Sequence, residues 1–185
     1  MGLDIVEYIV AIEEAFELDL PDADVAHLVT PAQLIDYLCA RLGEAHSGPP
    51  LVQSAFYWLR RGLAEELAVP RLTICPASTI ARLTDRAEAE VWAAVARRLA
   101  VNPKFLTHSP LPRWLARLVR DADRTVGRVA EDLAMFHPAA FRRGAGGWTR
   151  AQVMEVVLRL LEYEIGIAVT PTQLHYTFVG DLGMG

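Results

Sequence analysis

The chain of 185 residues has few of the side chains that bind metals or form disulfides. It has only two cysteines, Cys39 and Cys75, which stand far apart without Cys-x-x-Cys spacing. We expect both to be buried free thiols. Five histidines are scattered without the i, i+4 spacing that places two imidazoles on one helix face. The sequence therefore predicts no metal site and no cofactor.

Long hydrophobic runs are also missing, because charged residues interrupt every apolar stretch before it could span a bilayer. The first residues lack the basic start and apolar run of a signal peptide. We therefore expect a soluble cytoplasmic protein without a membrane partner. Hydrophobic residues make up 52% of the chain, which is enough to bury a sizeable core in one compact domain or two small ones.

The sequence offers no recognisable catalytic constellation. Its four serines are not in a Gly-x-Ser-x-Gly turn and have no suggestive histidine or aspartate context: Ser47, Ser54, Ser78 and Ser109. Adjacent carboxylates such as Glu13 and Glu14 diverge by about 100° on a helix and seldom converge on one substrate. The glycine-rich segments lack the strand and lysine of a phosphate-binding loop. We expect a protein that is not an enzyme.

Charge is distributed unevenly along the chain, whose net charge is −5. Residues 1–46 hold ten acidic and one basic side chain, whereas residues 47–147 hold fifteen basic and nine acidic ones. This polarity is typical of a surface that steers a partner, and it equally suits attraction between two parts of one chain.

What the sequence has in abundance is helical periodicity. In the opening run, Ile5, Ile9, Ile12 and Phe16 share one face, and the acidic residues Asp4, Glu7 and Glu14 lie elsewhere. Helix start signals, each a threonine followed by an amphipathic stretch, occur at Thr30 and Thr149. No segment reads as a strand. The patterns predict an all-α fold.

Residues 3–24, LDIVEYIVAIEEAFELDLPDAD, followed by VTPAQLIDYL, resemble the second half of an acyl carrier protein. In that family the first of these helices opens with Asp-Ser-Leu, and the serine carries the phosphopantetheine arm. Met1, Gly2 and Leu3 occupy those positions here, and Gly2 has no hydroxyl to modify. The resemblance therefore implies a carrier-like bundle without its attachment site.

The end of the chain resembles the first half of the same family. RAQVMEVVLRLLEYEIGI and VTPTQLHYTFVGDLGMG are similar to a carrier protein's first helix and long loop. Asp181, Leu182 and Gly183 occupy the acidic-Leu-Gly turn that precedes the serine in that family. The two halves of the carrier pattern thus stand in reversed order along the chain.

Neither half buries its apolar stripe alone, so we predict that the N-terminal helices are completed by the C-terminal helix. They meet either within one chain, as a circular permutation, or between two chains, as a domain-swapped homodimer. We expect residues 1–46 with 148–185 to form this permuted bundle. Residues 51–137 are expected to form an inserted helical module, which is either a second, divergent carrier-like bundle or an unrelated one.

The resemblance implies a non-catalytic binding or scaffold protein of fatty-acid or polyketide metabolism. In the family, an acidic helix docks on basic patches of partner enzymes, so Asp4, Glu7, Glu13 and Glu14 are the candidate partner-binding residues. The alternative is a functional carrier modified at an unrecognised serine. A lesser alternative is nucleic-acid binding, suggested by interleaved arginines and tryptophans. We disfavour it because the net charge is negative and the tryptophans fit core positions.

Overall fold

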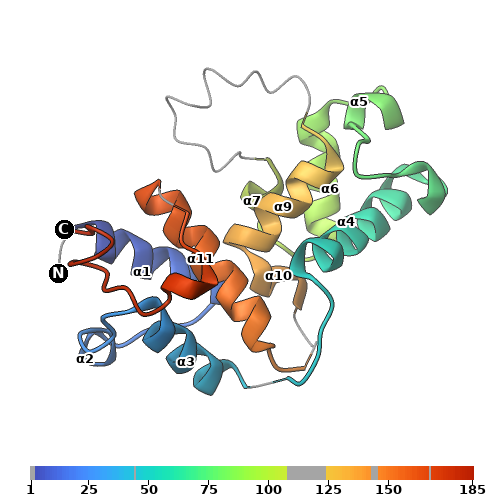
Figure 1. Ribbon diagram of the computed structural model, residues 1–185. Coiled ribbons are helices and arrows are strands. Elements are labelled where there is room, and N and C mark those ends of the chain that lie inside the picture. The colour runs from blue at the N-terminus through green and yellow to red at the C-terminus, as the bar shows by residue number, and fades with distance from the viewer. Residues whose placement is uncertain (1–2, 44, 108–123, 143–145, 167) are drawn as a thin grey trace. The chain divides into compact units, whose positions relative to one another are not determined.

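The computed structural model describes residues 3–43, 45–107, 124–142, 146–166 and 168–185 (Figure 1). Within these ranges the chain forms helices and no strands, and one isolated antiparallel bridge joins Thr79 to Thr125. The predicted all-α class is confirmed. The contacts divide the chain into two compact units. The first unit comprises Met1–Pro50 and Arg142–Gly185, and the second comprises Leu51–Phe141.

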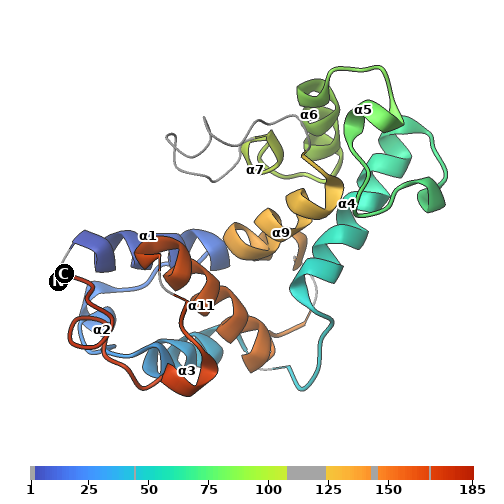
Figure 2. The same ribbon diagram turned by 45° about the horizontal axis from the view of Figure 1, so that its top comes forward.

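The first unit is built from both ends of the chain. Its helices are α1 (Leu3–Phe16), α2 (Asp22–Val25), α3 (Pro31–Leu42) and α11 (Arg150–Ile165), followed by the 3-10 turn η3 (Pro171–Gln173). Helix α11 packs against both α1 and α3 (Figure 2). These helices share one core because each of them turns an apolar stripe inward, with fully buried side chains that include Ile12, Leu34, Leu38, Val157 and Leu160.

Both predicted helix starts are present. The side chains of Thr30 and Thr149 accept hydrogen bonds from the backbone N–H groups of Gln33 and Gln152, and the two glutamines bond back to the cap residues. Each start is therefore a capping box, which satisfies amides that have no partner within the helix. Helix α11 ends at Gly166, whose φ of 70° is the left-handed conformation that glycine adopts without strain.

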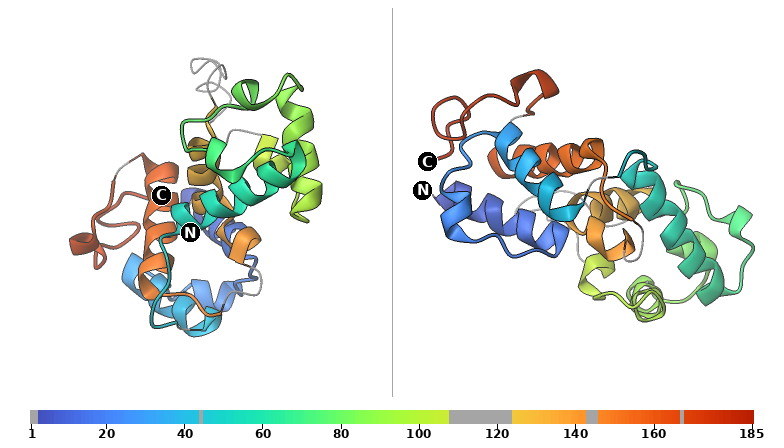
Figure 3. Two further views of the ribbon diagram at one scale, coloured as in Figure 1. Left: turned by 90° about the vertical axis from the view of Figure 1, so that its right-hand side faces the viewer. Right: turned by 90° about the horizontal axis from the view of Figure 1, so that it is seen from below.

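Hydrogen bonds join the two chain ends within the first unit. The Tyr8 hydroxyl donates to the Val157 carbonyl oxygen at 3.0 Å, and the Phe178 N–H donates to the Val29 carbonyl oxygen at 3.0 Å. Trp148 packs edge-to-face on Phe16, with ring centroids 4.9 Å apart. The start of α1 and the end of the chain consequently lie close together in every view (Figures 1, 2 and 3).

The second unit is a separate helical bundle. It contains α4 (Leu51–Leu67), η1 (Arg71–Thr73), α5 (Ile80–Leu83), α6 (Glu88–Arg98), α7 (Lys104–Thr107), α9 (Val126–Phe136) and most of α10 (Pro138–Arg142). Helix α4 packs against α9 and α6. A Cβ at Gly62 would lie 2.8 Å from Cδ1 of Leu99, so the glycine allows a close approach near the end of α6.

The expectation that both cysteines are buried is wrong. Cys39 is half-buried, and Cys75 is exposed. Cys75 precedes Pro76 in the turn before α5, where the Ser78 N–H donates to the Cys75 carbonyl oxygen at 2.9 Å. Because this turn runs over the surface, the Cys75 side chain does not enter the core.

Candidate protein-docking surface

Helix α1 has an inner and an outer face. Ile5, Tyr8, Ile12 and Phe16 are buried on the inner face, as the spacing of most of these residues predicts. Leu3, Val6 and Val10 point outward and are 69%, 43% and 45% exposed. Burying a large aliphatic side chain stabilises a protein, and an exposed one lacks this stabilisation. Several exposed aliphatic side chains on one helix face therefore indicate a surface that a partner can cover.

Carboxylates lie among these aliphatic side chains. Glu7 follows Leu3 by four residues and Glu14 follows Val10 by four, so all of them share the outer surface of the helix, and both glutamates are exposed. We call Leu3, Val6, Glu7, Val10 and Glu14 the α1 face. It combines an apolar centre with acidic neighbours, which is the usual anatomy of a protein–protein interface.

The other two predicted partner-binding residues lie differently. Asp4 is exposed beside the α1 face, but Glu13 is half-buried, and its Oε1 accepts a hydrogen bond of 2.6 Å from the Leu20 N–H. Glu13 therefore fixes the chain where it turns after α1. Helical periodicity does not predict this local role, because the bond depends on how the segment after the helix folds back.

The charge of α1 extends to the neighbouring helix α11. The pKa of the Glu164 carboxyl is raised, mainly by burial and further by the negative charges of Glu7 and Asp4. These three residues therefore form one acidic region contributed by both ends of the chain. A cationic surface that docks there relieves the repulsion among them.

The turn formed by Asp181, Leu182 and Gly183 is ordered by its own hydrogen bonds. The Asp181 carboxylate accepts bonds from the backbone N–H and the hydroxyl of Thr177 at 2.7 and 2.9 Å, and these bonds lower the pKa of Asp181. Leu182 is half-buried, and Gly183 has a positive φ of 70°. Gly2 lies outside the described residues.

A cavity of about 410 Å³ lies between this turn region and α1. Its lining is mostly apolar and comes from α1, from the end of α2 with the segment after it, and from the loop before the Asp181 turn: Ile5, Val25, Ala26, Leu28, Val29, Thr177, Phe178, Val179 and Gly180. Val29 and Val179 are among the exposed large hydrophobic side chains. The resemblance to carrier bundles implies that an apolar ligand can lie between the helices, but the sequence did not identify the lining of this cavity, because three segments far apart in the chain form it.

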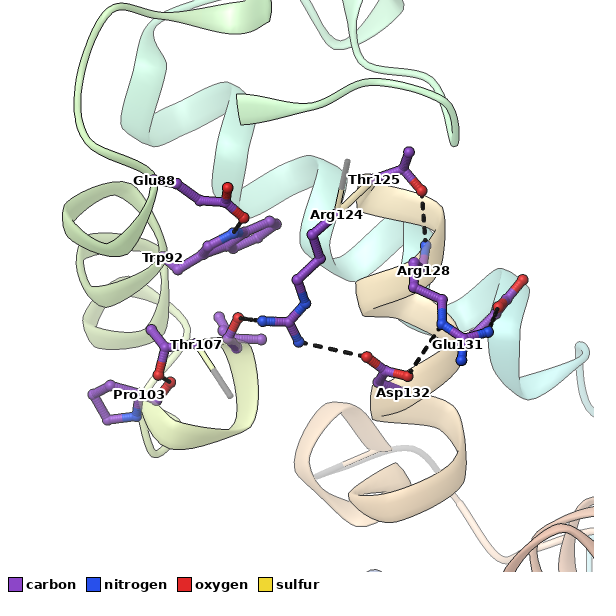
Figure 4. Close-up of polar contacts among 10 residues, drawn as sticks. Glu88, Trp92, Pro103, Thr107, Arg124, Thr125, Arg128, Glu131 and Asp132 are labelled. Atoms are coloured by element: carbon purple, nitrogen blue, oxygen red, sulfur yellow. Dashed lines mark hydrogen bonds and ion pairs between the residues drawn. The ribbon is translucent and has the colours of Figure 1, made fainter. Parts of the chain in front are cut away.

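The second unit contains a smaller cavity of about 180 Å³ beside Glu88, Trp92 and Arg124 (Figure 4). The Trp92 and Arg124 side chains beside it form polar contacts within the protein. The Trp92 indole N–H donates to Glu88 at 3.0 Å, and Arg124 donates to the Leu106 carbonyl oxygen at 2.7 Å and pairs with the buried Asp132 at 3.5 Å. We therefore interpret this network as structural.

Other candidate chemistry finds no support in the described part of the chain. No group of three or more metal-ligating side chains occurs there, and no helix there is long and apolar enough to cross a membrane. Trp92 is almost fully buried, so its ring is not free to stack on a nucleic-acid base. No family model, curated protein or solved structure matches the chain.

Proposed function

We propose that this chain is a non-catalytic docking protein of the acyl carrier kind that has lost the phosphopantetheine serine. Its α1 face binds a partner protein that presents a basic patch around an apolar centre. The partner is an acyl-processing enzyme of fatty-acid or polyketide type. The observation that carries this proposal is the exposure of three aliphatic side chains among carboxylates on a single helix face.

The physical argument rests on how interfaces gain affinity. Covering Leu3, Val6 and Val10 removes apolar surface from water, which favours association. Glu7 and Glu14 add selectivity, because they attract a cationic partner and repel an anionic one. Within the described residues neither glutamate forms an ion pair, so both are available to a partner.

The arrangement of the first unit supports the carrier interpretation. The segments that resemble a carrier's first helix and loop, α11 and the Asp181 turn, pack beside the segments that resemble its later helices, α1 and α3. Gly2 stands at the position of the attachment serine, and a glycine cannot form the phosphodiester. We therefore propose that the chain retains the docking role of the family it resembles but carries no acyl group.

A functional carrier modified at another serine is the competing proposal. Ser78 is buried, and its hydroxyl accepts a hydrogen bond of 3.0 Å from the Cys75 N–H. Ser47 and Ser54 are not on α1 or the Asp181 turn, and Ser109 lies outside the described residues. Among the described serines none therefore stands at the start of α1, where the resemblance places the modified residue.

A second candidate function is suggested by the apolar cavity of the first unit. A cavity of about 410 Å³ is within the size range of small-molecule sites, and its walls suit an aliphatic ligand held without a covalent tether. Fluorescence of the neutral probe N-phenyl-1-naphthylamine tests this function. Saturable enhancement that Ala26→Phe abolishes is expected for a ligand site, and enhancement unchanged by this cavity-filling variant would contradict it.

Site-specific photo-cross-linking in the natural host tests the docking proposal. A photoreactive amino acid replaces Val10 on the α1 face, and a control protein carries it instead of the exposed Glu162 on α11. We expect an acyl-processing enzyme to be cross-linked from position 10 and not from position 162. The cross-link should be lost when Glu7→Lys and Glu14→Lys are added, because a basic partner is then repelled.

Two results would contradict docking through α1. One is the same set of cross-linked proteins from positions 10 and 162. The other is a partner whose cross-link persists at the same yield after both charge reversals. Circular dichroism of each variant shows whether the helices remain folded, which the exposure of the substituted side chains leads us to expect.

A further inference from the structure

The two units carry opposite net charges. The first unit holds fourteen acidic and five basic residues, for a net charge of −9, whereas the second holds thirteen basic and nine acidic residues, for +4. Summed charge of this size produces a field that orients molecules as they approach each other. Two copies of the chain therefore attract each other when the first unit of one faces the second unit of the other.

Three arginines of the first unit are bonded away from the α1 face, and a fourth, Arg142, donates to the Gly147 carbonyl oxygen at 2.9 Å. Arg150 pairs with Asp36, Arg159 pairs with Glu155 at 3.0 Å, and Arg41 donates to the Tyr37 hydroxyl at 2.8 Å. Glu7 instead raises the pKa of a neighbouring carboxyl, that of Glu164. The carboxylates of this face are therefore available to bind a cationic surface of another molecule.

The second unit has a matching surface of opposite charge, which we call the Arg61 patch and define as Tyr57, Arg60, Arg61, Arg71 and Leu72. The patch spans α4 and η1, which are joined by a hydrogen bond of 2.6 Å from Nε of Arg60 to the Arg71 carbonyl oxygen. Leu72 is 90% exposed and Tyr57 is 54% exposed. Large apolar side chains are thus exposed beside arginines on this surface, whereas those of the α1 face are exposed beside carboxylates.

Two arginines of this patch differ from Arg86 and Arg98 on the same unit. Arg86 and Arg98 both pair with Glu66, at 3.0 and 3.4 Å. Arg61 and Arg71 are exposed, and no ion pair joins them to a carboxylate of the described residues. Arg61 and Arg71 therefore lie, without an ion pair, beside exposed apolar side chains, as an interface requires.

We propose that the α1 face of one copy docks on the Arg61 patch of a second copy. The contact places aliphatic side chains of α1 against Tyr57 and Leu72, while Glu7 and Glu14 meet Arg61 and Arg71. Such a contact is heterologous, because two different surfaces meet, so it closes into a ring or continues as an open chain. Self-association also covers the α1 face and thereby competes with any other partner for it.

This inference does not depend on the resemblance to carrier proteins or on the identity of an enzyme partner. It rests on the charges and exposed side chains of the two surfaces alone. It also differs from a domain swap, in which apolar helices are exchanged and charge reversal on the surface has little effect. The two kinds of assembly are therefore separable by experiment.

Sedimentation velocity of the full chain measures the association directly. We expect a mass that rises above the 20.5 kDa monomer with increasing protein concentration at low salt. Raising the salt from about 0.05 M to 0.5 M should weaken the association at least tenfold, because it screens charges at the rim of the contact. A monomer at every concentration and salt would overturn the proposal.

Paired charge reversals identify the two surfaces. The Glu7→Arg/Glu14→Arg variant loses the acidic face, and the Arg61→Glu/Arg71→Glu variant loses the basic patch, so each alone should be monomeric. Mixed together, the two should form a complex, because the intact patch of the first meets the intact face of the second. Glu162→Arg changes the charge on another helix of the first unit and should associate like the wild type.

A mixture that stays monomeric would refute the pairing of these two surfaces. Association that survives in either variant alone would refute it as well and would indicate a swapped dimer. If the Glu7→Arg/Glu14→Arg variant does not fold, the isosteric variant Glu7→Gln/Glu14→Gln replaces it in the sedimentation experiment. It should associate at least tenfold more weakly than the wild type, and unchanged association would contradict the proposal.

Discussion

Single polar atoms in the first unit connect residues far apart in the sequence. The Tyr8 hydroxyl is fully buried and reaches the Val157 carbonyl oxygen on another helix, and its burial raises the pKa of the phenol. A buried hydroxyl without a partner is costly, so this bond favours one relative position of α1 and α11.

The Tyr8→Phe variant removes that bond and keeps the ring. We expect its free energy of unfolding to fall by about 1 kcal/mol, which is the usual net contribution of such a bond. Chemical denaturation measures the change. Tyr37→Phe is the matched control, because it removes an exposed hydrogen bond from a tyrosine hydroxyl to Asp24. Its free energy of unfolding should fall by less than that of Tyr8→Phe. Equal losses would contradict the role that we assign to Tyr8.

The acidic region around Glu164 makes stability depend on pH. Its carboxyl has a raised pKa in the folded state, so the folded protein holds this proton more firmly than the unfolded chain does. The contribution of Glu164 to stability therefore decreases as the pH rises from its ordinary pKa through the raised value.

Glu164→Gln removes this penalty. We expect the unfolding free energy at pH 7 to rise by about 0.5 kcal/mol, the size of a like-charge interaction on a helix surface, and to change little near pH 4. Urea titrations at both pH values test this expectation, with the exposed Glu162→Gln as the control. A loss of stability at pH 7 would show that the Glu164 carboxylate makes a favourable contact instead.

At the scale of residues, the sequence predicted most of the buried positions and few of the polar roles. Periodicity identified Ile5, Ile12 and Phe16 as inner residues, and these are buried. The same periodicity does not show that Glu13 bonds to Leu20, or that Cys75 lies in an exposed turn. Such roles depend on backbone geometry outside the helices, which has no repeating pattern.

At the scale of elements, helix starts were the most predictable feature because their chemistry is local. A threonine side chain at the first position and a glutamine three residues later suffice to form a capping box at Thr30 and at Thr149. Short helices were not predictable in the same way. The four residues of α5 and of α7 are too few to show a hydrophobic period.

The cap of α11 provides a test at this scale. Thr149→Ala leaves the backbone N–H of Gln152 without its acceptor and should lower the unfolding free energy by about 1 kcal/mol. Thr149→Ser keeps a hydroxyl oxygen and should retain most of the stability. Thermal unfolding of both variants gives the comparison. Alanine and serine variants of equal stability would show that the cap contributes nothing.

At the scale of the whole molecule, the first unit depends on segments from both ends of the chain. Leu160 on α11 is fully buried in its core, and α11 packs on both α1 and α3. The reversed order of the two segments and their separate apolar stripes predicted that they would meet. The cavity and the exposed aliphatic side chains of α1 emerged only from the folded chain.

Leu160→Ala tests whether the two ends unfold together. Truncating a buried leucine costs about 3 kcal/mol, because the variant loses apolar burial and keeps part of the cavity. Hydrogen exchange followed by mass spectrometry should show faster exchange in α1, α3 and α11 alike, with α4 and α9 unchanged. Faster exchange confined to α11 would contradict a unit that is built from both ends.

Intact-protein mass spectrometry tests the central claim, that the first unit is a carrier-like bundle without its attachment serine. Two proteins are treated with coenzyme A and a phosphopantetheinyl transferase: the wild type, and a variant with Met1→Asp and Gly2→Ser behind a short leader. We predict an unmodified wild type and a variant that gains the mass of one phosphopantetheine group. An adduct on the wild type, or none on a folded variant, would contradict the account.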